Sequence, residues 1–308
     1  MTTILYSHEA CLNHDPGAFH PECPDRLRAV LAALDAPRFA GLVRREAPLA
    51  SIDDLARVHS RHQIDTVFKA VPQEGYAPID NDTVVSPGSG EAALRAAGAC
   101  IAAVDAVLKG EAKNAFCAVR PPGHHAEPDQ AMGFCLFNNV AVGAMHARAA
   151  HGVRRIAIID FDVHHGNGSQ AVAEQDIDLF YASTHQWPLY PGTGSAKETG
   201  LGNIVNAPLR AGANSADFRV AIGEWIMPQL GQFAPDLVMI SAGFDAHRDD
   251  PLAGLRLVED DFTWVTEQLT GFAERYCGGR LVSTLEGGYD LAALASSTAA
   301  HVAALMAA

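Results

Sequence analysis

The sequence lacks the features of nucleic-acid-binding, exported and membrane-spanning proteins. Its 22 basic residues are outnumbered by 36 acidic ones, and the formal net charge of −14 argues against a nucleic-acid-binding surface. No stretch reaches the roughly 18 consecutive apolar residues of a membrane span. The N-terminal MTTILYSHEA has neither the basic segment nor the long apolar run of an export signal. We therefore expect a cytoplasmic protein that binds neither nucleic acid nor membrane.

Paired cysteines and internal repeats are missing as well. The six cysteines are scattered without a CxxC pair, which excludes a zinc ribbon and a thioredoxin-type motif and fits a reducing compartment. The sequence has no repeats, low-complexity tracts or linker composition. With 308 residues, 48% of them hydrophobic, it can bury a large core. We expect one α/β domain over residues 1–308.

Short apolar runs that turn polar at their ends alternate with amphipathic segments. This alternation predicts a mostly parallel sheet covered by helices on both sides. The predicted strands are residues 4–6, 115–119, the run that begins at residue 156, and residues 178–184, 203–209, 236–245 and 280–290. The predicted helices are residues 25–34, 53–69, an alanine-rich segment that ends at residue 110, and residues 139–150, 216–232 and 259–276. Residues 71–89 are predicted to form a surface loop.

Aspartates and histidines crowd the end of the central apolar run, in the sequence DFDVHHGNG. Asp162 and His164 are two residues apart, so they point the same way from an extended segment and can bind one metal ion. A third ligand is offered by Asp245, which follows the apolar run LVMISAGF. Two oxygens and one nitrogen leave coordination positions open, as a catalytic zinc requires. The alternative is that these aspartates cap the next helices, but their density favours a metal.

A second polar turn, RPPGHH, follows the strand at residues 115–119. Its adjacent histidines, His124 and His125, are suited to acid–base chemistry near neutral pH. A right-handed crossover through the helix at 139–150 places this turn and the Asp/His cluster on the same edge of the sheet. The remaining histidines that we considered are interpreted as ordinary surface or packing residues: His146, His151 and His301.

Four motifs resemble those of the histone deacetylase superfamily, particularly its class II and bacterial deacetylase-like branch. They are RPPGHHAEPDQAMGFCLFNN, DFDVHHGNG, SAGFDAHRDDPL and LEGGYD, in this order over nearly the whole chain, and HPECPDRL resembles the first loop of that branch. The resemblance implies the arginase-deacetylase fold, a three-layer α/β/α arrangement with a mostly parallel eight-stranded sheet. It also implies zinc-dependent removal of an acyl group from an amine.

The resemblance assigns roles to the residues of these motifs. Asp162, His164 and Asp245 would bind Zn²⁺. His125 would be the general base toward the attacking water and would later protonate the leaving amine, and His124 would be its electrostatic partner.

Further residues would support this machinery. By the same resemblance, Asp160 would orient His124, and Asn167, where some relatives carry aspartate, would orient His125. Such contacts fix the tautomer of each ring. Tyr289 would donate a hydrogen bond to the acyl oxygen as negative charge develops there.

The resemblance also implies a narrow substrate tunnel. Phe134 matches one wall, and the backbone of Gly133 would meet the alkyl chain of the substrate. Tyr190 stands where relatives usually have phenylalanine, which keeps the aromatic wall and adds a hydroxyl. Most relatives bind a structural K⁺ behind the zinc, and that pattern is matched by Asp160, Asp162, His164 and Ser183.

Substrate class is less sharply indicated. Leu252 stands where the polyamine-selective branch carries glutamate. This difference favours acyl-lysine in proteins or peptides over acetylpolyamines as the substrate. Small acylated amines stay open as substrates, and so do the acyl length and the oligomeric state.

A binuclear ureohydrolase shares the fold, but its second metal needs a carboxylate at Gly166, and His247 replaces another aspartate. A non-catalytic acyl-lysine binder would be expected to have lost His125, Tyr289 or a zinc ligand, and all of these are present.

Overall fold

The computed structural model describes residues 2–308, and its centre is a sheet of eight strands. The strand order is β2-β1-β5-β10-β9-β6-β7-β8, and all neighbouring pairs are parallel. The strands are β1 (Thr3–Ser7), β2 (Val43–Glu46), β5 (Asn114–Cys117), β6 (Ile156–Asp160), β7 (Leu179–Gln186), β8 (Ile204–Leu209), β9 (Leu237–Ala242) and β10 (Leu281–Leu285). The predicted eight-stranded parallel sheet is confirmed, without an antiparallel member.

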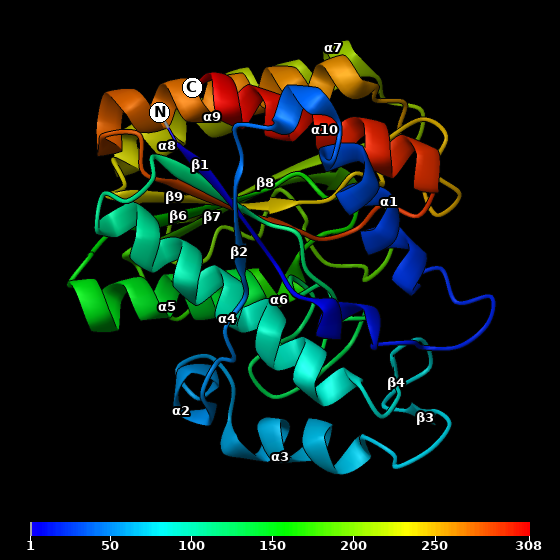
Figure 1. Ribbon diagram of the computed structural model, residues 1–308. Coiled ribbons are helices and arrows are strands. Elements are labelled where there is room, and N and C mark those ends of the chain that lie inside the picture. The colour runs from blue at the N-terminus through cyan, green and yellow to red at the C-terminus, as the bar shows by residue number, and fades with distance from the viewer. Residues whose placement is uncertain (1) are drawn as a thin grey trace.

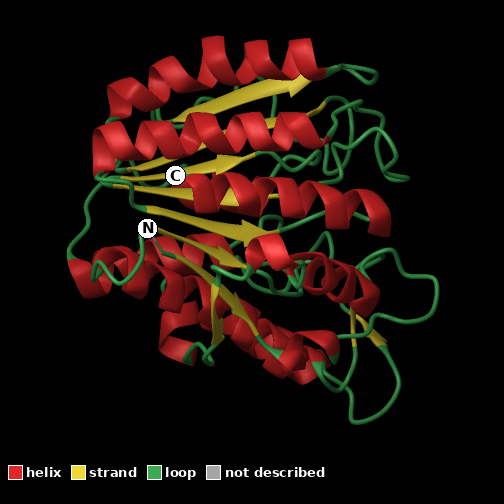
Figure 2. Cartoon of the chain, turned by 45° about the horizontal axis from the view of Figure 1, so that its top comes forward, coloured by secondary structure: helices red, strands yellow, loops and turns green. Residues whose placement is uncertain are grey.

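Helices cover both faces of this sheet, as the three-layer prediction requires (Figures 1 and 2). One layer holds α1 (Pro24–Leu34), α7 (Ser215–Val220), α8 (Met227–Phe233), α9 (Glu259–Cys277) and α10 (Leu291–Ala307). The other holds α4 (Ser89–Leu108), α5 (Asn139–His151) and α6 (Asn167–Ala173), with α2 (Ile52–Leu55) and α3 (Arg61–Ala70) packed outside it. In the described part of the chain, no helix combines the length and apolar character of a membrane span.

Burial explains which strands can be predicted from the sequence. Every residue of β5, β6, β7, β9 and β10 is buried, because helices cover both faces, and such strands read as continuous apolar runs. The edge strand β2 has the sequence VRRE and all four residues are exposed. It has no apolar run, which is why the sequence analysis did not predict it.

Three predicted segments differ in detail from the structure. The helix expected at 53–69 is divided into α2 and α3, because Ser60 accepts the N–H of Gln63 and starts a new helix. The predicted loop at 71–89 contains a two-stranded antiparallel hairpin, β3 (Ala77–Pro78) and β4 (Val84–Val85). The helix predicted at 216–232 has a π-helical turn, η3 (Ala221–Ile226), just before Pro228, a residue that cannot donate a backbone hydrogen bond.

Because all eight strands run in one direction, their carboxyl ends meet at one edge of the sheet. Figure 2 shows the long loops gathered at the end toward which the strand arrows point. Open α/β sheets bind their ligands at this edge. The topology therefore brings the loops after β5, β6, β9 and β10 together.

A buried ion-pair cluster ties the N-terminal loop to this edge. Glu22 contacts Arg120 through both carboxylate oxygens, at 2.5 and 2.7 Å, and its Oε1 accepts a hydrogen bond from Arg26 at 2.9 Å. All three side chains are fully buried. Arg120 also donates to the backbone carbonyls of Cys11 and His14. Although burial raises the pKa of Glu22, Arg120 and the other cations beside it hold that pKa well below its ordinary value.

We expect Glu22→Gln to lower the free energy of unfolding by about 3 kcal/mol or more, because it leaves two buried guanidinium groups without their carboxylate. Denaturant unfolding at pH 7 measures the effect. Glu46→Gln, at an exposed position of β2, is the matched control and should change stability little. Equal stability of the two variants would contradict the role of the cluster.

The effect of Glu22→Gln should also depend on pH. A carboxyl group with a depressed pKa contributes its full stabilisation above its unfolded pKa of about 4.3 and loses it as the pH falls through the folded value. The difference in stability between wild type and variant should therefore be constant near neutral pH and shrink below about pH 4.

Candidate active site

Three possible metal ligands meet where β6 and β9 end side by side. Asp162 and His164 lie on the loop after β6, and Asp245 lies on the loop after β9, the neighbouring strand. Nδ1 of His164 is 3.2 Å from Oδ1 of Asp162 and 3.1 Å from Oδ2 of Asp245. The ligand atoms of all three residues lie within 4.8 Å of one another, and all three side chains are buried. The structure thus brings together the three residues that the sequence analysis selected.

Backbone amides hold the two carboxylates in place. Asp162 accepts the N–H groups of Gly287 at 2.8 Å and His164 at 2.9 Å, and Asp245 accepts that of Val163 at 2.9 Å. Burial and the adjacent Asp162 raise the pKa of Asp245 to about 7. Two buried carboxylates beside one imidazole form a donor set that suits a divalent cation such as Zn²⁺, with positions left open.

Glycines allow the chain to approach these carboxylates closely. A Cβ atom on Gly287 would lie 2.1 Å from Oδ2 of Asp245, and one on Gly243 would lie 2.0 Å from Oδ2 of Asp162. Contacts this short are forbidden, so both positions require glycine for space. Gly288 instead has a φ of +124°, a backbone conformation that side-chain-bearing residues rarely adopt.

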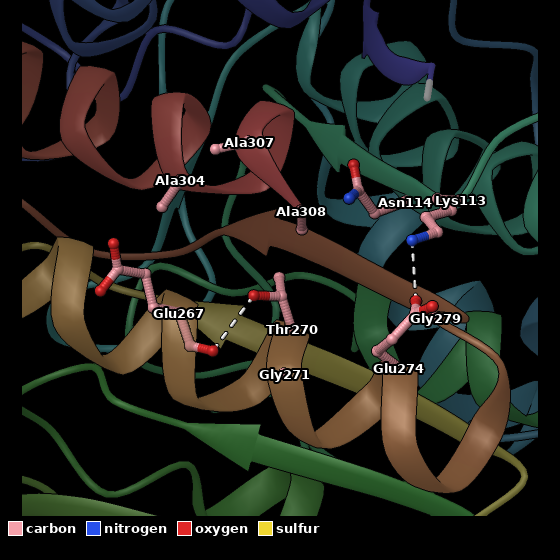
Figure 3. A pocket seen from close by; sticks show the side chains of 10 residues that line it. All are labelled: Lys113, Asn114, Glu267, Thr270, Gly271, Glu274, Gly279, Ala304, Ala307 and Ala308. Carbon is pink, nitrogen blue, oxygen red and sulfur yellow. Dashed lines mark hydrogen bonds and ion pairs between the residues drawn. The ribbon is translucent and has the colours of Figure 1, made fainter.

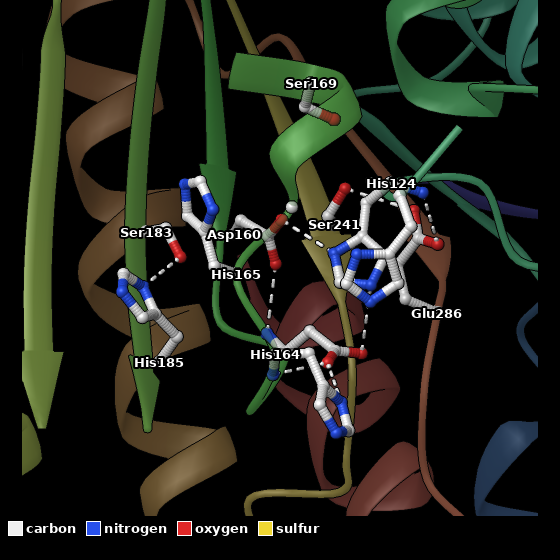
Figure 4. A network of polar contacts seen from close by, with 12 residues as sticks. His124, Asp160, His164, His165, Ser169, Ser183, His185, Ser241 and Glu286 are labelled. Atoms are coloured by element: carbon white, nitrogen blue, oxygen red, sulfur yellow. Dashed lines mark hydrogen bonds and ion pairs between the residues drawn. The ribbon is translucent and has the colours of Figure 1, made fainter. Parts of the chain in front are cut away.

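The adjacent histidines after β5 have different partners. Nδ1 of His124 contacts Oδ2 of Asp160 (Figure 4) at a distance of 3.0 Å, and Nδ1 of His125 lies 2.8 Å from Oδ1 of Asn167. The amide nitrogen of Asn167 donates to Glu127 at 2.7 Å, which turns its oxygen toward His125. An amide oxygen only accepts, so Nδ1 of His125 carries the proton and its Nε2 is free to accept one.

These partners push the two pKa values apart. Burial lowers the pKa of His124, but the carboxylates of Asp160 and Asp162 outweigh it and raise that pKa to about 10. Burial and the neighbouring imidazoles of His124 and His164 lower the pKa of His125 well below its usual range. At neutral pH the pair therefore combines one cationic and one neutral imidazole, the neutral one poised to act as a base.

His125, the neutral histidine of the pair, faces a cavity of about 220 Å³. Its ring lies edge-on to Tyr190 with centroids 5.1 Å apart, and Phe134 lies edge-on to Tyr289 at 5.8 Å. Asp82 and Leu189 also line the cavity, and the sequence analysis did not assign them to the site. The lining residues it did assign are His125, Gly133, Phe134, His164, Tyr190, Leu252 and Tyr289.

Arg26 and Asp250, which the sequence analysis did not identify, hold Tyr289 in place. The guanidinium of Arg26 lies 4.7 Å from the centroid of the Tyr289 ring and donates to the carbonyls of Gly288 and Glu286, both at 2.5 Å. Asp250 accepts the N–H of Tyr289 at 2.7 Å. Burial raises the pKa of the Tyr289 hydroxyl, and Arg26 offsets this only partly, so the hydroxyl stays protonated and can donate.

Glu286 anchors the histidine turn. Its Oε2 accepts the N–H groups of Gly123 at 2.6 Å and His124 at 3.2 Å, and Ser241 donates to its Oε1 at 3.1 Å (Figure 4). The carboxylate is fully buried. It therefore connects the end of β10 to the turn after β5 through backbone hydrogen bonds.

His165 and Ser183 have hydrogen-bond partners outside the Asp/His/Asp cluster. His165 contacts Thr193 at 2.7 Å and Gln170 at 2.8 Å. Ser183 lies opposite Asp160 in the β6–β7 register, and its hydroxyl contacts Nδ1 of His185 at 2.9 Å (Figure 4).

A larger hollow of about 340 Å³ lies near the C-terminus between α9 and α10 (Figure 3). Its charged lining includes the ion pair between Lys113 and Glu274, 2.7 Å apart. Among its lining residues are neither histidines nor cysteines. The smaller cavity beside His125 is therefore the candidate active site.

The sequence matches the histone deacetylase domain over residues 20–305. It is 44% identical to a protein of Pseudomonas aeruginosa named histone deacetylase-like amidohydrolase, over 94% of this chain and 82% of that protein. It is 39% identical to histone deacetylase 14, chloroplastic, of Arabidopsis thaliana, over 98% of this chain and 76% of that protein. The structure superposes on the crystal structure of the HDA15 HD domain with a TM-score of 0.94 and 37% identity, covering 99% of this chain and 90% of that one.

The close approach at Gly287 yields a prediction about metal binding. We expect Gly287→Ala to weaken Zn²⁺ binding by at least about tenfold, because the added methyl group displaces Asp245. Competition with a chromophoric chelator measures the affinity. Gly271→Ala in α9 is the control, since a Cβ there meets no atom within 4 Å. Unchanged affinity in Gly287→Ala would show that these carboxylates do not hold the metal.

Proposed function

The chain belongs to the histone deacetylase family, and we propose that it is a zinc-dependent amide hydrolase acting on acyl-lysine. It removes an acetyl or other short acyl group from the side-chain amine of a protein or peptide. One observation carries this proposal: a small cavity is lined by a neutral histidine, a protonated tyrosine and His164, which belongs to the Asp/His/Asp cluster. Amide hydrolysis needs a base, a Lewis acid and an oxyanion donor, and these groups match those needs.

Asp162, His164 and Asp245 are the proposed zinc ligands. When bound there, Zn²⁺ supplies a Lewis acid that polarises the amide carbonyl and makes a water molecule more acidic. We also assign a structural K⁺ to Asp160, Asp162, His164 and Ser183. The buried carboxylate of Asp160 and its position opposite Ser183 in the β6–β7 register support this second ion.

His125 is the proposed general base. Its Nε2 accepts a proton from the attacking water as the water oxygen bonds to the amide carbon, and returns that proton to the amine nitrogen as the C–N bond breaks. Asn167 keeps the Nδ1 proton in place throughout. His124, held as a cation by Asp160, contributes positive charge near the oxygen on which negative charge develops.

Tyr289 is the proposed donor to the acyl oxygen. Its hydroxyl hydrogen-bonds that oxygen more strongly as the carbonyl becomes tetrahedral and negatively charged. Arg26 and Asp250 act as positioning residues, because they hold the tyrosine ring and its backbone N–H.

The residues that line the cavity are suited to contact an alkyl chain of a substrate. Phe134 and Tyr190 offer aromatic faces, and Gly133 offers backbone, which together fit the methylene groups of a lysine side chain. Leu252 is apolar, so a second cationic group on a polyamine finds no partner there. A small acylated amine is the second candidate, favoured by the carboxylate of Asp82 in the cavity lining.

Two other classes fit less well. A Cβ atom on Gly166 would already lie 2.3 Å from Oδ2 of Asp160, so this position has no room for the carboxylate that a binuclear ureohydrolase needs. A non-catalytic binder has no use for the paired orientation of His125 and Asn167. We therefore propose one catalytic metal and hydrolysis.

We also propose a reducing compartment such as the cytoplasm. All six cysteines are free thiols, and five of them are buried. Oxidised secreted proteins typically pair their cysteines.

Tyr289→Phe tests the proposed function. We expect kcat on an acetyl-lysine peptide to fall by about 10²-fold or more, because one donor to the developing oxyanion is lost. Zinc content should stay the same, since the hydroxyl is not a ligand. Tyr76→Phe, at an exposed tyrosine, is the control and should keep full turnover. Full turnover by Tyr289→Phe would remove this residue from the mechanism.

A further inference from the structure

A second cluster of possible metal ligands lies between α4 and α5, and none of its three residues belongs to the motifs above. Nε2 of His146 and Nε2 of His151, both on α5, each lie 2.7 Å from Oδ1 of Asp105 on α4. One ligand atom from each residue lies within 4.8 Å of the others. The sequence analysis interpreted both histidines as ordinary, yet the fold directs both at one carboxylate oxygen.

We propose that Asp105, His146 and His151 form a binding site for a divalent transition metal such as Zn²⁺. Two imidazole nitrogens and one carboxylate oxygen are a donor set that binds Zn²⁺, and that cations preferring all-oxygen sites, such as Ca²⁺ and Mg²⁺, do not favour. The side chains of His146, His151 and Asp105 are 13%, 18% and 33% exposed. Metal ions in solution can reach them, and water can complete the coordination.

A contact with Lys109 leaves one oxygen of the Asp105 carboxylate available to bind a metal. Nζ of Lys109, the C-cap residue of α4, lies 2.8 Å from Oδ2 of Asp105. This contact occupies one oxygen and leaves Oδ1 facing the two histidines. Asp105 therefore binds the metal through a single oxygen.

The surroundings of His146 also suit a metal ligand. When Nε2 binds a metal, Nδ1 carries the ring proton and needs an acceptor. Oδ1 of Asp54 lies 4.0 Å from Nδ1 of His146, so a small movement gives the carboxylate–histidine–metal arrangement common in proteins. Arg57, which approaches the same nitrogen at 3.4 Å, is already paired with Asp54 and can move with it.

Without metal, both histidines donate Nε2–H to Asp105. When the ion binds, each neutral ring carries its proton on Nδ1 instead, and Nε2 becomes the ligand atom. Metal–ligand bonds of about 2.0–2.1 Å at tetrahedral angles place ligand atoms about 3.3 Å apart. The two 2.7 Å contacts of Asp105 must therefore widen by about 0.6 Å. Partly exposed side chains at a helix surface, with His151 as the last residue of α5, can make this adjustment.

The position of the cluster indicates what the metal does. α4 and α5 lie side by side, as Figure 1 shows, and α5 begins at Asn139, directly after the loop that carries His125 and Phe134. His151 is at the opposite end of that helix. A metal at this cluster cross-links the two helices away from the reaction, and it stabilises the folded protein as its concentration rises.

Zinc stoichiometry tests this site. Tag-free protein is equilibrated with Zn²⁺ by dialysis, and bound metal is counted per chain. We expect two ions in the wild type and one in His146→Gln/His151→Gln, while His62→Gln, at an exposed histidine of α3, keeps two. Asp245→Ala should lose the catalytic ion and keep the one between α4 and α5. Equal zinc content in wild type and His146→Gln/His151→Gln would overturn the site.

The same set of variants separates this site from the proposed function. If Asp245→Ala keeps its full zinc content while His146→Gln/His151→Gln loses one ion, the catalytic assignment fails and the α4–α5 site stands. Thermal unfolding gives a second readout, because added Zn²⁺ raises the midpoint of the wild type more than that of the double variant. Circular dichroism without metal verifies that the variant is folded. Identical shifts in both proteins would contradict the proposal.

Discussion

The structure depends on the burial of two carboxylates side by side. Asp162 and Asp245 are fully buried at the ends of adjacent parallel strands, where each negative charge is costly and each disfavours the other. Backbone amides, the imidazole of His164 and glycines that leave space hold them there. A divalent cation would satisfy this arrangement, so the all-parallel topology that aligns the strand ends also brings together the ligands of the proposed metal site.

The same edge makes two neighbouring histidines chemically different. His124 faces a carboxylate and is held as a cation, whereas His125 faces an amide oxygen and stays neutral. The difference comes from Asp160 and Asn167, which lie seven residues apart on β6 and at the start of α6. In the proposed mechanism, this difference assigns charge stabilisation to His124 and proton transfer to His125, and Tyr289 completes the set of groups that amide hydrolysis needs.

Much of this organisation could be predicted from the sequence, because fully buried parallel strands are continuous apolar runs and their polar ends mark the ligand edge. The spacing of Asp162 and His164 and the position of Asp245 led to the cluster that the structure brings together. The exposed strand β2 gave no such signal. Arg26 supports the tyrosine loop from 262 residues away, and Asp105 meets histidines 41 and 46 residues later on another helix. Contacts of this kind are set by packing, which local spacing does not encode.

The most direct test of the account is acetate release while Zn²⁺ is titrated into metal-stripped protein. An acetyl-lysine peptide and an N-acetylated polyamine are compared, with Asp245→Ala as the control. We expect release from the peptide to rise from near zero to a plateau as the site fills. We expect the polyamine to be the poorer substrate and the control to stay inactive. Release that is independent of zinc, or no release from either substrate at any zinc concentration, would contradict it.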